Sequence, residues 1–380
     1  MNTIEACVLS SFVSLSEDCI FTYLVDRGYC KSNDVIQEIR SLPGRNHNFR
    51  VKCSDHQDWI VKQEVRDQHG CDEIFLTEWA VQLLLSKSDR LKPLREFIPP
   101  VLHYDRPNSI LISQFLPQHQ DLSNYYGDWE NEFDPAIAHT LGHNLGLLHC
   151  LTFDQESDRN QLTEIAPNFI QYCCPSDVAP IDRFTPEMLG WIRSDALTFF
   201  KWYQQQPDLN KALTLLEQQW RSCCLVHQDL RLENWLFDPT AQDLQLIDWE
   251  RSGWGDPDTD IANVLCAYLK LWLETVPSSG TWQARLEEAE LPLEQIKPSL
   301  NALMSGYFRA FPERNHPETI RRILQWTGRQ LIYLVQIQIQ YHRPIASTEA
   351  AFLHIAQKLI LYPEVLCLLL FDHSYSAIPV

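Results

Sequence analysis

The sequence is short of positive charge and lacks a segment that would carry it to or through a membrane. Its 380 residues include 31 Lys and Arg against 50 Asp and Glu, a formal net charge of −19. Such a chain repels phosphate backbones and anionic lipid, so we expect no nucleic-acid and no membrane partner. The first basic residue is Arg27, too late for a secretory signal, and the apolar run Val365–Phe371 is too short to span a bilayer. These absences predict a cytoplasmic protein that tolerates a cationic partner, and no pattern specifies an oligomeric state.

The twelve cysteines lack the spacing of a zinc knuckle or of a disulfide framework. Two adjacent pairs occur, Cys173-Cys174 and Cys223-Cys224, but there is no C-x-x-C. Without an export signal, we expect reduced thiols that act as small buried hydrophobic residues. The sequence also has no internal repeat and no low-complexity tract.

The length, composition and apolar patterns of the chain suggest a globular protein of two to three folding units, with both strands and a helix in its N-terminal part. Hydrophobic residues make up 45% and charged residues 21% of the chain, which excludes wholesale disorder. Alternating apolar residues predict a hairpin over 48–65, and helical spacing follows over 72–87. Short strands are expected at 101–103 and 110–115. Strands with one helix, followed by helices, favour an α+β fold with a small sheet-containing lobe.

The rest of the chain is predicted to be mostly helical. Amphipathic helices are expected over 135–151, 186–206, 292–311 and 317–342. Between the first two, 152–183 is irregular and is interpreted as a long loop or a partly helical insertion. With the connector at 114–123, we divide the chain into an N-terminal lobe, 1–117, and a C-terminal lobe, 118–380.

The residues that indicate a catalytic site lie between 225 and 265. An apolar dipeptide leads into His227-Gln228-Asp229, and Asn234 follows five positions after Asp229, ahead of a second apolar run. Past a turn comes Ile247-Asp248-Trp249-Glu250. Magnesium takes hard oxygen ligands, and Asn234 and Asp248 provide them. The spacing places Asp229 beside the metal as a base rather than as a ligand.

A single Asp or Asn at the end of a strand is more often a turn former than a site residue. The conjunction of these two motifs with Gly255-Asp256-Pro257 is what argues against coincidence. Asp256 before Pro257 also has a plain structural reading, because it predicts a helix that starts with an aspartate cap.

At these residues the sequence resembles the aminoglycoside phosphotransferase and choline kinase family, which has a protein-kinase-like, two-lobed fold. His227 to Asn234 is similar to its catalytic motif, and Ile247 to Glu250 to its metal-binding segment. The resemblance implies ATP and Mg²⁺ as cofactors, with Asp229 as catalytic base and Asn234 and Asp248 as metal ligands. It also implies that Asp260 anchors the catalytic loop through backbone amides.

The same resemblance assigns residues of the N-terminal lobe to the nucleotide. Lys62 ends a predicted strand where the family holds the phosphates, with Glu78 as its acidic partner. The phosphate-covering loop is 43–48 and includes Gly44 and Asn46, but only Gly44 is glycine, so side chains of Arg45 or Asn46 are alternatives to backbone amides. Gln114 and Leu116 belong to the strand and hinge whose backbone would bind adenine.

The histidines of 139–149, His227 and Glu250 could each have a structural role or a role in a site. His139 and His143 stand at i and i+4, with His149 further on, but no general-base Glu lies between them, so packing is favoured over zinc. We expect the His227 ring to bond the loop that carries Asp248. Glu250 either contacts magnesium through water or pairs with a basic residue such as Arg251.

The acceptor is not specified by these motifs, and three functions compete. The first is phosphorylation of a small-molecule hydroxyl, such as that of an amino-alcohol or amino-sugar. The second is phosphorylation of Ser or Thr in a peptide, and the third is a nucleotide-binding scaffold without turnover. Acids and aromatic residues in 124–130, including Asp128 and Glu130, would suit a cationic amine, although they are equally typical of a solvated loop.

Overall fold

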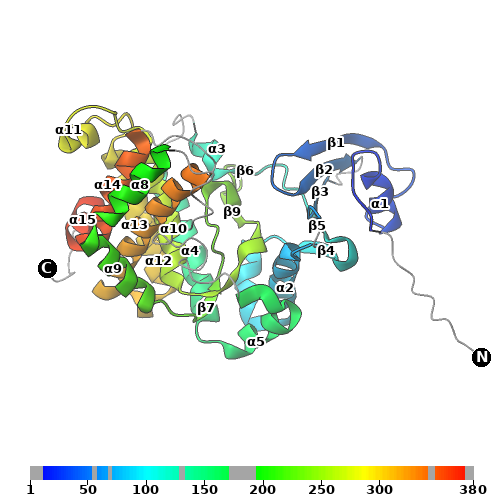
Figure 1. Ribbon diagram of the computed structural model, residues 1–380. Coiled ribbons are helices and arrows are strands. Elements are labelled where there is room, and N and C mark those ends of the chain that lie inside the picture. Colours follow the sequence, from blue (N-terminus) through cyan, green and yellow to red (C-terminus); the bar gives the residue numbers. More distant parts are fainter. Residues whose placement is uncertain are drawn as a thin grey trace, which may run out of the picture.

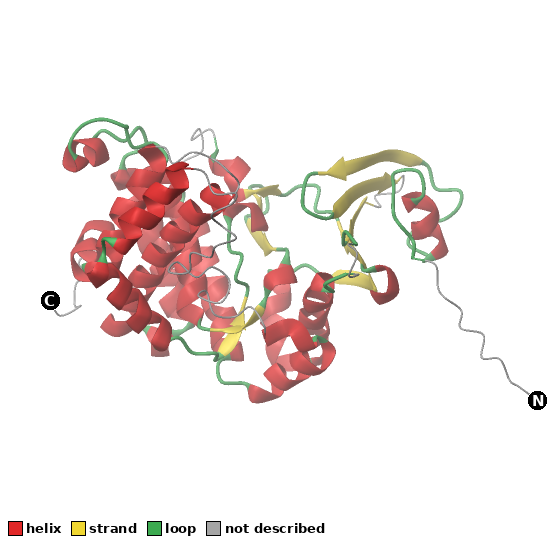
Figure 2. Ribbon diagram, in the orientation of Figure 1, coloured by secondary structure: helices red, strands yellow, loops and turns green. Residues whose placement is uncertain are grey.

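The structure is a computed structural model that describes residues 12–53, 58–66, 71–127, 133–170, 194–340 and 347–372. It has a small lobe with a β-sheet and a larger, mostly helical lobe (Figures 1 and 2). This arrangement confirms the predicted α+β class.

The small lobe is built on an antiparallel sheet with the strand order β1-β2-β3-β5-β4. Its strands are β1 (Ile36–Leu42), β2 (His47–Cys53), β3 (Asp58–Gln63), β4 (Val101–Asp105) and β5 (Ile110–Gln114). The predicted hairpin is β2 with β3, and its turn, 54–57, lies outside the described residues. The register pairs Asn48 with Lys62 and Phe49 with Val61, so Lys62 lies on the face opposite to the buried Val61.

The two faces of this sheet belong to different environments. Helix α1 (Ile20–Asp26), which the sequence did not predict, packs Ile20 and Leu24 against Val51 and Val61 in a small separate core. Helix α2 (Ile74–Lys87), predicted over 72–87, belongs instead to the large core of the helical lobe. The cation of Lys62 therefore faces away from the small core.

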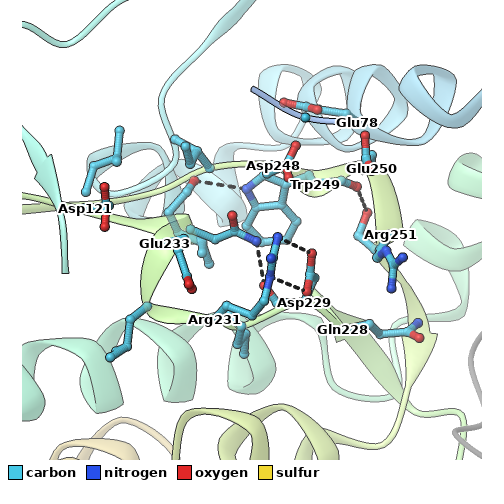
Figure 3. A pocket seen from close by; sticks show the side chains of 18 of the residues that line it. Glu78, Asp121, Gln228, Asp229, Arg231, Glu233, Asp248, Trp249, Glu250 and Arg251 are labelled. Carbon is cyan, nitrogen blue, oxygen red and sulfur yellow. Dashed lines mark hydrogen bonds and ion pairs between the residues drawn. The ribbon is translucent and has the colours of Figure 1, made fainter. Parts of the chain in front are cut away.

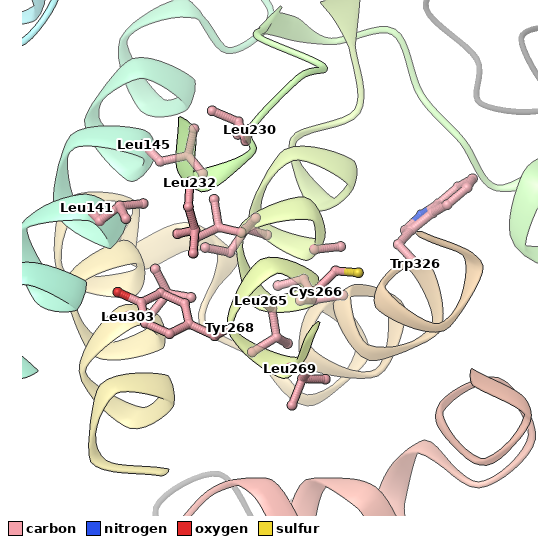
Figure 4. Packing of buried hydrophobic residues seen from close by; sticks show 14 of the residues in the cluster. Leu141, Leu145, Leu230, Leu232, Leu265, Cys266, Tyr268, Leu269, Leu303 and Trp326 are labelled. Atoms are coloured by element: carbon pink, nitrogen blue, oxygen red, sulfur yellow. The ribbon is translucent and has the colours of Figure 1, made fainter. Parts of the chain in front are cut away.

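Helices form most of the large lobe and surround one continuous hydrophobic core. Figure 4 shows Leu141 and Leu145 packed near Leu303 and Tyr268, residues that come from three different helices. The helices are α3 (Leu122–Tyr126), α4 (Pro135–Thr152), α5 (Glu156–Ile165), α8 (Ser194–Gln204), α9 (Pro207–Gln218), α10 (Pro257–Leu273), α11 (Trp282–Glu287), α12 (Leu293–Ala310), α13 (Pro317–Gln340), α14 (Ser347–Leu361) and α15 (Pro363–Leu370).

Short strands place the predicted motifs at the edge of this lobe. They are β6 (Gln120–Asp121), β7 (Cys224–Val226), β8 (Trp235–Asp238), β9 (Asp243–Leu246) and β10 (Gly253–Gly255). β7 pairs with β10, and β8 lies between β6 and β9. The segment similar to the family's catalytic motif, 227–234, leaves β7 and ends at β8, and we call it the catalytic loop. The segment similar to the family's metal-binding segment, 247–250, follows β9, and we call it the metal-binding loop.

Helix positions agree with the sequence periodicity where the structure describes them. α4, α12 and α13 confirm the predicted helices at 135–151, 292–311 and 317–342, and α8 covers the second half of 186–206. In the irregular stretch 152–183, α5 confirms the partly helical alternative, and 171–183 lie outside the described residues.

Within the described ranges, no single helix has the length and apolar character of a membrane span; the bent pair Thr348–Leu361 with Pro363–Leu370 meets the criteria of length and composition only when taken together.

The histidines of α4 have roles in packing. His149 is fully buried and contacts the Tyr307 hydroxyl through Nδ1 at 3.0 Å and Asp260 through Nε2 at 3.4 Å. The rings of His139 and His143 stack with centroids 6.5 Å apart. Among the described residues, no group of three or more His, Cys, Asp or Glu side chains is placed to hold a metal ion.

Candidate active site

A cleft of about 1730 Å³ lies between the sheet of the small lobe and the helices of the large lobe. All the residues predicted for catalysis, nucleotide and metal line it, although they come from distant parts of the chain. They are Gly44, Asn46, Lys62, Glu78, Gln114, Leu116, Asp229, Asn234 and Asp248. The fold therefore brings the predicted site together in one place.

The catalytic loop is held by a buried carboxylate. Asp260, in the first turn of α10, is fully buried and accepts hydrogen bonds from the backbone N–H groups of His227 (2.6 Å) and Gln228 (2.9 Å). α10 begins at an Asp256 cap that accepts from Asp258 N, as predicted. The anchoring role expected of Asp260 is thus present in the hydrogen bonds.

The His227 ring joins the catalytic loop to the metal-binding loop. Its Nε2 lies 2.9 Å from Ile247 O, which can only accept, so Nε2 carries a proton. Its Nδ1 lies 3.3 Å from the backbone N of Asp229, which donates, so Nδ1 accepts. Both bonds are those of a neutral imidazole, and burial lowers the pKa of His227 in agreement. The expected structural role of this histidine is confirmed.

Asp229 lines the cleft, and its carboxylate contacts Arg231, a partner that the sequence did not predict. Arg231 Nε lies 3.0 Å from its Oδ1, and Arg231 Nη2 lies 3.2 Å from its Oδ2 (Figure 3). Asn234 donates from Nδ2 to the backbone carbonyl of Asp229 at 2.7 Å, so its amide oxygen is the side-chain atom with which it could bind a metal ion. The sequence signal for Arg231 is its place two residues after Asp229.

The metal-binding loop lies directly against the catalytic loop. Ile247 N donates to Asn234 O at 3.0 Å, so the two candidate ligands, Asn234 and Asp248, occupy adjacent segments. Gln228 and Asp248 both have left-handed backbone conformations, with φ of 65° and 70°. Such conformations are unfavourable for residues other than glycine. Residues held in them are found most often at functional sites, so their presence in both loops supports a site here.

Lys62 connects the two lobes through carboxylates. Its Nζ lies 2.5 Å from Asp248 Oδ1 and 3.6 Å from Glu78 Oε2. The predicted pair with Glu78 is present, and the closer contact with Asp248 was not foreseen. Burial opposes the charge on Lys62, but the two carboxylates raise its pKa above the ordinary value. Burial likewise opposes the charge on Asp248, and Lys62 outweighs it, so the pKa of Asp248 is lowered.

Glu250 lies in the same charged cluster. Burial, with the nearby charge of Asp248 as the second cause, raises the pKa of Glu250 to about 7. Lys62 acts on it in the opposite direction, whereas Arg251 is the weakest of the causes. Burial and the neighbouring carboxylates thus outweigh the effects of Lys62 and Arg251 on the pKa of Glu250.

The loop between β1 and β2 lines the cleft from the small lobe. Gly44, Arg45 and Asn46 all border it, and the exposed Arg45 has its Nη2 3.9 Å from Asp72 Oδ2. At the opposite edge, Gln114 ends β5 and Leu116 follows in the connector, both lining the cleft. Phe115 between them donates its backbone N–H to Asp58 O at 2.8 Å, which fixes the path of the hinge.

Comparison with known proteins agrees with this geometry. The model of the Phosphotransferase enzyme family matches residues 38–298, which is more than half of the chain. The chain belongs to this family. The resemblance found in residues 227–262 is thereby confirmed, and members of such a family are kinase-type enzymes. No curated protein matches the sequence.

Solved structures share the fold of this family member at low identity. Plasmodium vivax ethanolamine kinase is 14% identical with a TM-score of 0.54, and the alignment covers 91% of each chain. Amicoumacin kinase, in complex with AMP-PNP, Ca²⁺ and Ami, is 12% identical with a TM-score of 0.53, covering 91% of this chain and 93% of that one. A type I macrolide 2′-phosphotransferase is 13% identical with a TM-score of 0.50, covering 92% and 98%. The kinase-like, two-lobed fold is therefore the fold of this chain.

Proposed function

We propose that this family member is an ATP- and Mg²⁺-dependent phosphotransferase whose acceptor is a hydroxyl group of a small molecule, the class that includes amino-alcohols and amino-sugars. The observation that carries the proposal is the contact between Lys62 of the small lobe and Asp248 of the large lobe, in a cleft that also contains Asp229. A cation for phosphates, a carboxylate for metal and a carboxylate for a hydroxyl are the three groups that phosphoryl transfer needs.

The nucleotide would bind along the sheet side of the cleft. Lys62, held by Glu78, would bind the α- and β-phosphates once it leaves Asp248. Gln114 and Leu116 at the hinge would receive the adenine, and the loop containing Gly44 and Asn46 would cover the phosphates. The departure of Lys62 from Asp248 would leave that carboxylate available to a metal ion.

The donor atoms near Asp248 suit magnesium. Asn234 and Asp248 offer an amide and a carboxylate oxygen, and the Asp248 carboxylate already binds a cation, the ammonium of Lys62. Magnesium takes few protein ligands and fills its remaining positions with phosphate and water oxygens. Bound there, it would neutralise charge that develops on the transferred phosphoryl group.

Asp229 would act on the acceptor. The acceptor hydroxyl oxygen forms a bond to the γ-phosphorus, the bond from that phosphorus to the β-phosphate oxygen breaks, and ADP leaves. Asp229 accepts the hydroxyl proton in this step. Arg231, which contacts both carboxylate oxygens, holds the Asp229 side chain in place until the acceptor binds.

The alternatives are a peptide kinase and a nucleotide-binding scaffold. A peptide acceptor would use the same cleft residues, so only a substrate assay separates it from a small molecule. The presence of Lys62, Asp229, Asn234 and Asp248 in one cleft argues against a scaffold without turnover.

The test is an assay of ADP release by the full chain with ATP and Mg²⁺ against amino-alcohols, aminoglycosides and synthetic Ser/Thr peptides. Asp229→Asn should lower transfer by about 10²- to 10⁴-fold while binding of AMP-PNP persists. Asp208→Asn, an exposed position in α9, is the matched control and should leave transfer unchanged. Equal turnover in Asp229→Asn and the parent would remove Asp229 from the mechanism.

A further inference from the structure

The guanidinium of Arg231 has donors that its contact with Asp229 does not use. Its Nε lies 3.0 Å from Asp229 Oδ1 and its Nη2 lies 3.2 Å from Oδ2, so one edge of the planar group faces both carboxylate oxygens (Figure 3). A guanidinium has five N–H donors, and among the described residues Nη1 of Arg231 has no hydrogen-bond or ion-pair partner. Arg231 can therefore bind a second anion beside the proposed base.

The side chain of Arg231 is open to the cleft. It lines the cleft and is 58% exposed, whereas the Asp229 side chain is 17% exposed. An exposed ion pair contributes little stability, because water screens it and long side chains lose freedom when they form it. Packing thus does not fix Arg231 in its present contact, and an anion brought close to it can compete with Asp229.

Arg231 and Lys62 occupy the two carboxylates that the proposed reaction needs. Lys62 Nζ lies 2.5 Å from Asp248, the proposed metal ligand, while Arg231 contacts Asp229, the proposed base. The two carboxylates lie on adjacent loops, because the His227 ring contacts Ile247 O at 2.9 Å and the backbone N of Asp229 at 3.3 Å. Since Lys62 is assigned to the α- and β-phosphates, Arg231 is the cation placed at the other end of the transfer.

The chemistry of transfer limits how far the phosphoryl group lies from this arginine. A hydroxyl whose proton passes to Asp229 lies about 2.6–3.2 Å from a carboxylate oxygen. Its own oxygen lies about 3–3.5 Å from the phosphorus that it attacks. The phosphorus is therefore within about 7 Å of the carboxylate that Arg231 contacts. Rotation about the side-chain bonds of Arg231 is enough to bring its guanidinium to the phosphoryl oxygens.

A guanidinium fits the transferred group in shape and charge. Its paired N–H donors match two phosphoryl oxygens. A cation placed there stabilises the charge that these oxygens carry during transfer. The hydroxyl also needs a free oxygen of Asp229, and Arg231 provides it when its guanidinium moves from the carboxylate to the phosphoryl group.

We infer that Arg231 is a further catalytic residue, which leaves Asp229 when the acceptor hydroxyl binds and donates hydrogen bonds to the oxygens of the transferred phosphoryl group. The inference rests on the proposed function and adds to it the residue that binds this group. Arg231 keeps its protons throughout, while the hydroxyl proton passes to Asp229 and ADP leaves. The charge of the acceptor does not enter, and Asp128 and Glu130, expected to suit a cationic one, lie outside the described residues.

The test measures binding of ADP with Mg²⁺ to the full chain, with and without fluoroaluminate, which mimics the phosphoryl group in transit. Contacts made to that group appear as extra affinity for such a mimic. Fluoroaluminate should tighten ADP binding to the parent, and this gain should be at least about tenfold smaller in Arg231→Gln, the usual effect of losing a charge-assisted contact. Binding of ADP without fluoroaluminate should stay the same. Arg231→Lys should keep part of the gain, because it retains the charge without the paired donors.

Transfer to an acceptor found in the substrate panel is the second readout. Arg231→Gln should lower kcat by about 10²- to 10³-fold, the usual cost of losing one donor directed at developing charge, with little change in KM for ATP. Arg106→Gln is the matched control. Arg106 contacts both oxygens of Glu73, at 2.8 and 3.1 Å, and is 57% exposed, but it is not among the residues that line the cleft. This variant should keep both the gain and kcat.

A second background separates a contact with the phosphoryl group from a role limited to holding Asp229. In Asp229→Asn the ion pair is already lost, so Arg231→Gln would cost nothing more if Arg231 only positioned that side chain. The inference predicts instead that Arg231→Gln again reduces the gain from fluoroaluminate by at least about tenfold in this background.

Each outcome bears on either the inference or the proposed function. An equal gain from fluoroaluminate in the parent and in Arg231→Gln overturns the inference, as does no gain in a parent that binds ADP. An effect that disappears in Asp229→Asn, or an equal loss in Arg106→Gln, overturns it as well. Failure of the parent to bind ADP with Mg²⁺, or to release ADP from ATP with every acceptor of the panel, would count against the proposed function itself.

Discussion

Single side chains decide whether the catalytic loop has its shape, and Asp260 is the most consequential of them. It satisfies two backbone N–H groups in a fully buried place, and charged acceptors make such bonds stronger than neutral ones. The loop itself contains Gln228 in an unfavourable left-handed conformation. The anchor therefore holds a strained segment that positions Asp229.

Asp260→Ala should destabilise the fold by about 2–5 kcal/mol, because it leaves two buried N–H groups without an acceptor. Asp260→Asn retains one side-chain oxygen and should lose less. Chemical denaturation of parent and both variants measures the difference. Equal stability of the Ala and Asn variants would contradict the anchoring role.

His227 makes stability depend on pH in one direction. Burial lowers its folded pKa below the ordinary value of about 6.5, so the unfolded chain binds a proton more readily. Its contribution is fully present above about pH 6.5 and declines as the pH falls toward the folded pKa. The free energy of unfolding of the parent should therefore approach that of His227→Gln as the pH falls from 8 to 5. A constant difference between them over that range would show that His227 does not titrate in this way.

At the scale of elements, the crossing of α4 and α12 depends on glycine. The sequence has 12 glycines, and three of them lie at this crossing, Gly142 and Gly146 on α4 and Gly306 on α12. A Cβ at Gly142 would lie 2.0 Å from Leu303 O, and one at Gly306 would lie 2.1 Å from His139 O. The helices can approach this closely only without side chains, and α4 in turn carries the His149 that contacts Asp260.

Gly142→Ala should destabilise the fold by about 1–3 kcal/mol through overpacking against a backbone that cannot move aside. Thr140→Ala, at an exposed position on the same helix, is the matched control and should change stability by less than about 0.5 kcal/mol. Thermal or denaturant unfolding distinguishes them. A Gly142→Ala variant as stable as Thr140→Ala would mean that the helices are packed less tightly than described.

Elements with strong periodicity were predictable from the sequence, whereas contacts between distant elements were not. The β2–β3 hairpin, α2 and α13 follow directly from apolar spacing. Helix α1 was missed because its burial depends on packing against the sheet that follows it in the chain. The contact of Lys62 with Asp248 depends on how the two lobes meet, which the local sequence pattern does not specify.

At the scale of the molecule, the cleft is shared by two lobes with different cores. One face of the sheet packs with α1, while Tyr104 and Leu111 of the sheet join α2 in the helical core, so Lys62 and Glu78 approach the cleft from two different elements of the small lobe. Asp248 and Asn234 come from the large lobe. The residues that we propose for nucleotide, metal and acceptor meet only when both lobes are in place.

The most direct test of this account is a calorimetric titration of AMP-PNP, with and without Mg²⁺, into the full chain and into Asp248→Ala and Asn234→Ala. Mg²⁺ should tighten binding to the parent, tighten it less in Asn234→Ala, and have no effect in Asp248→Ala, because the metal loses its carboxylate ligand. Without Mg²⁺ the three proteins should differ much less from one another. The same gain from Mg²⁺ in Asp248→Ala as in the parent would contradict the assignment of the metal site and with it the proposed phosphotransfer.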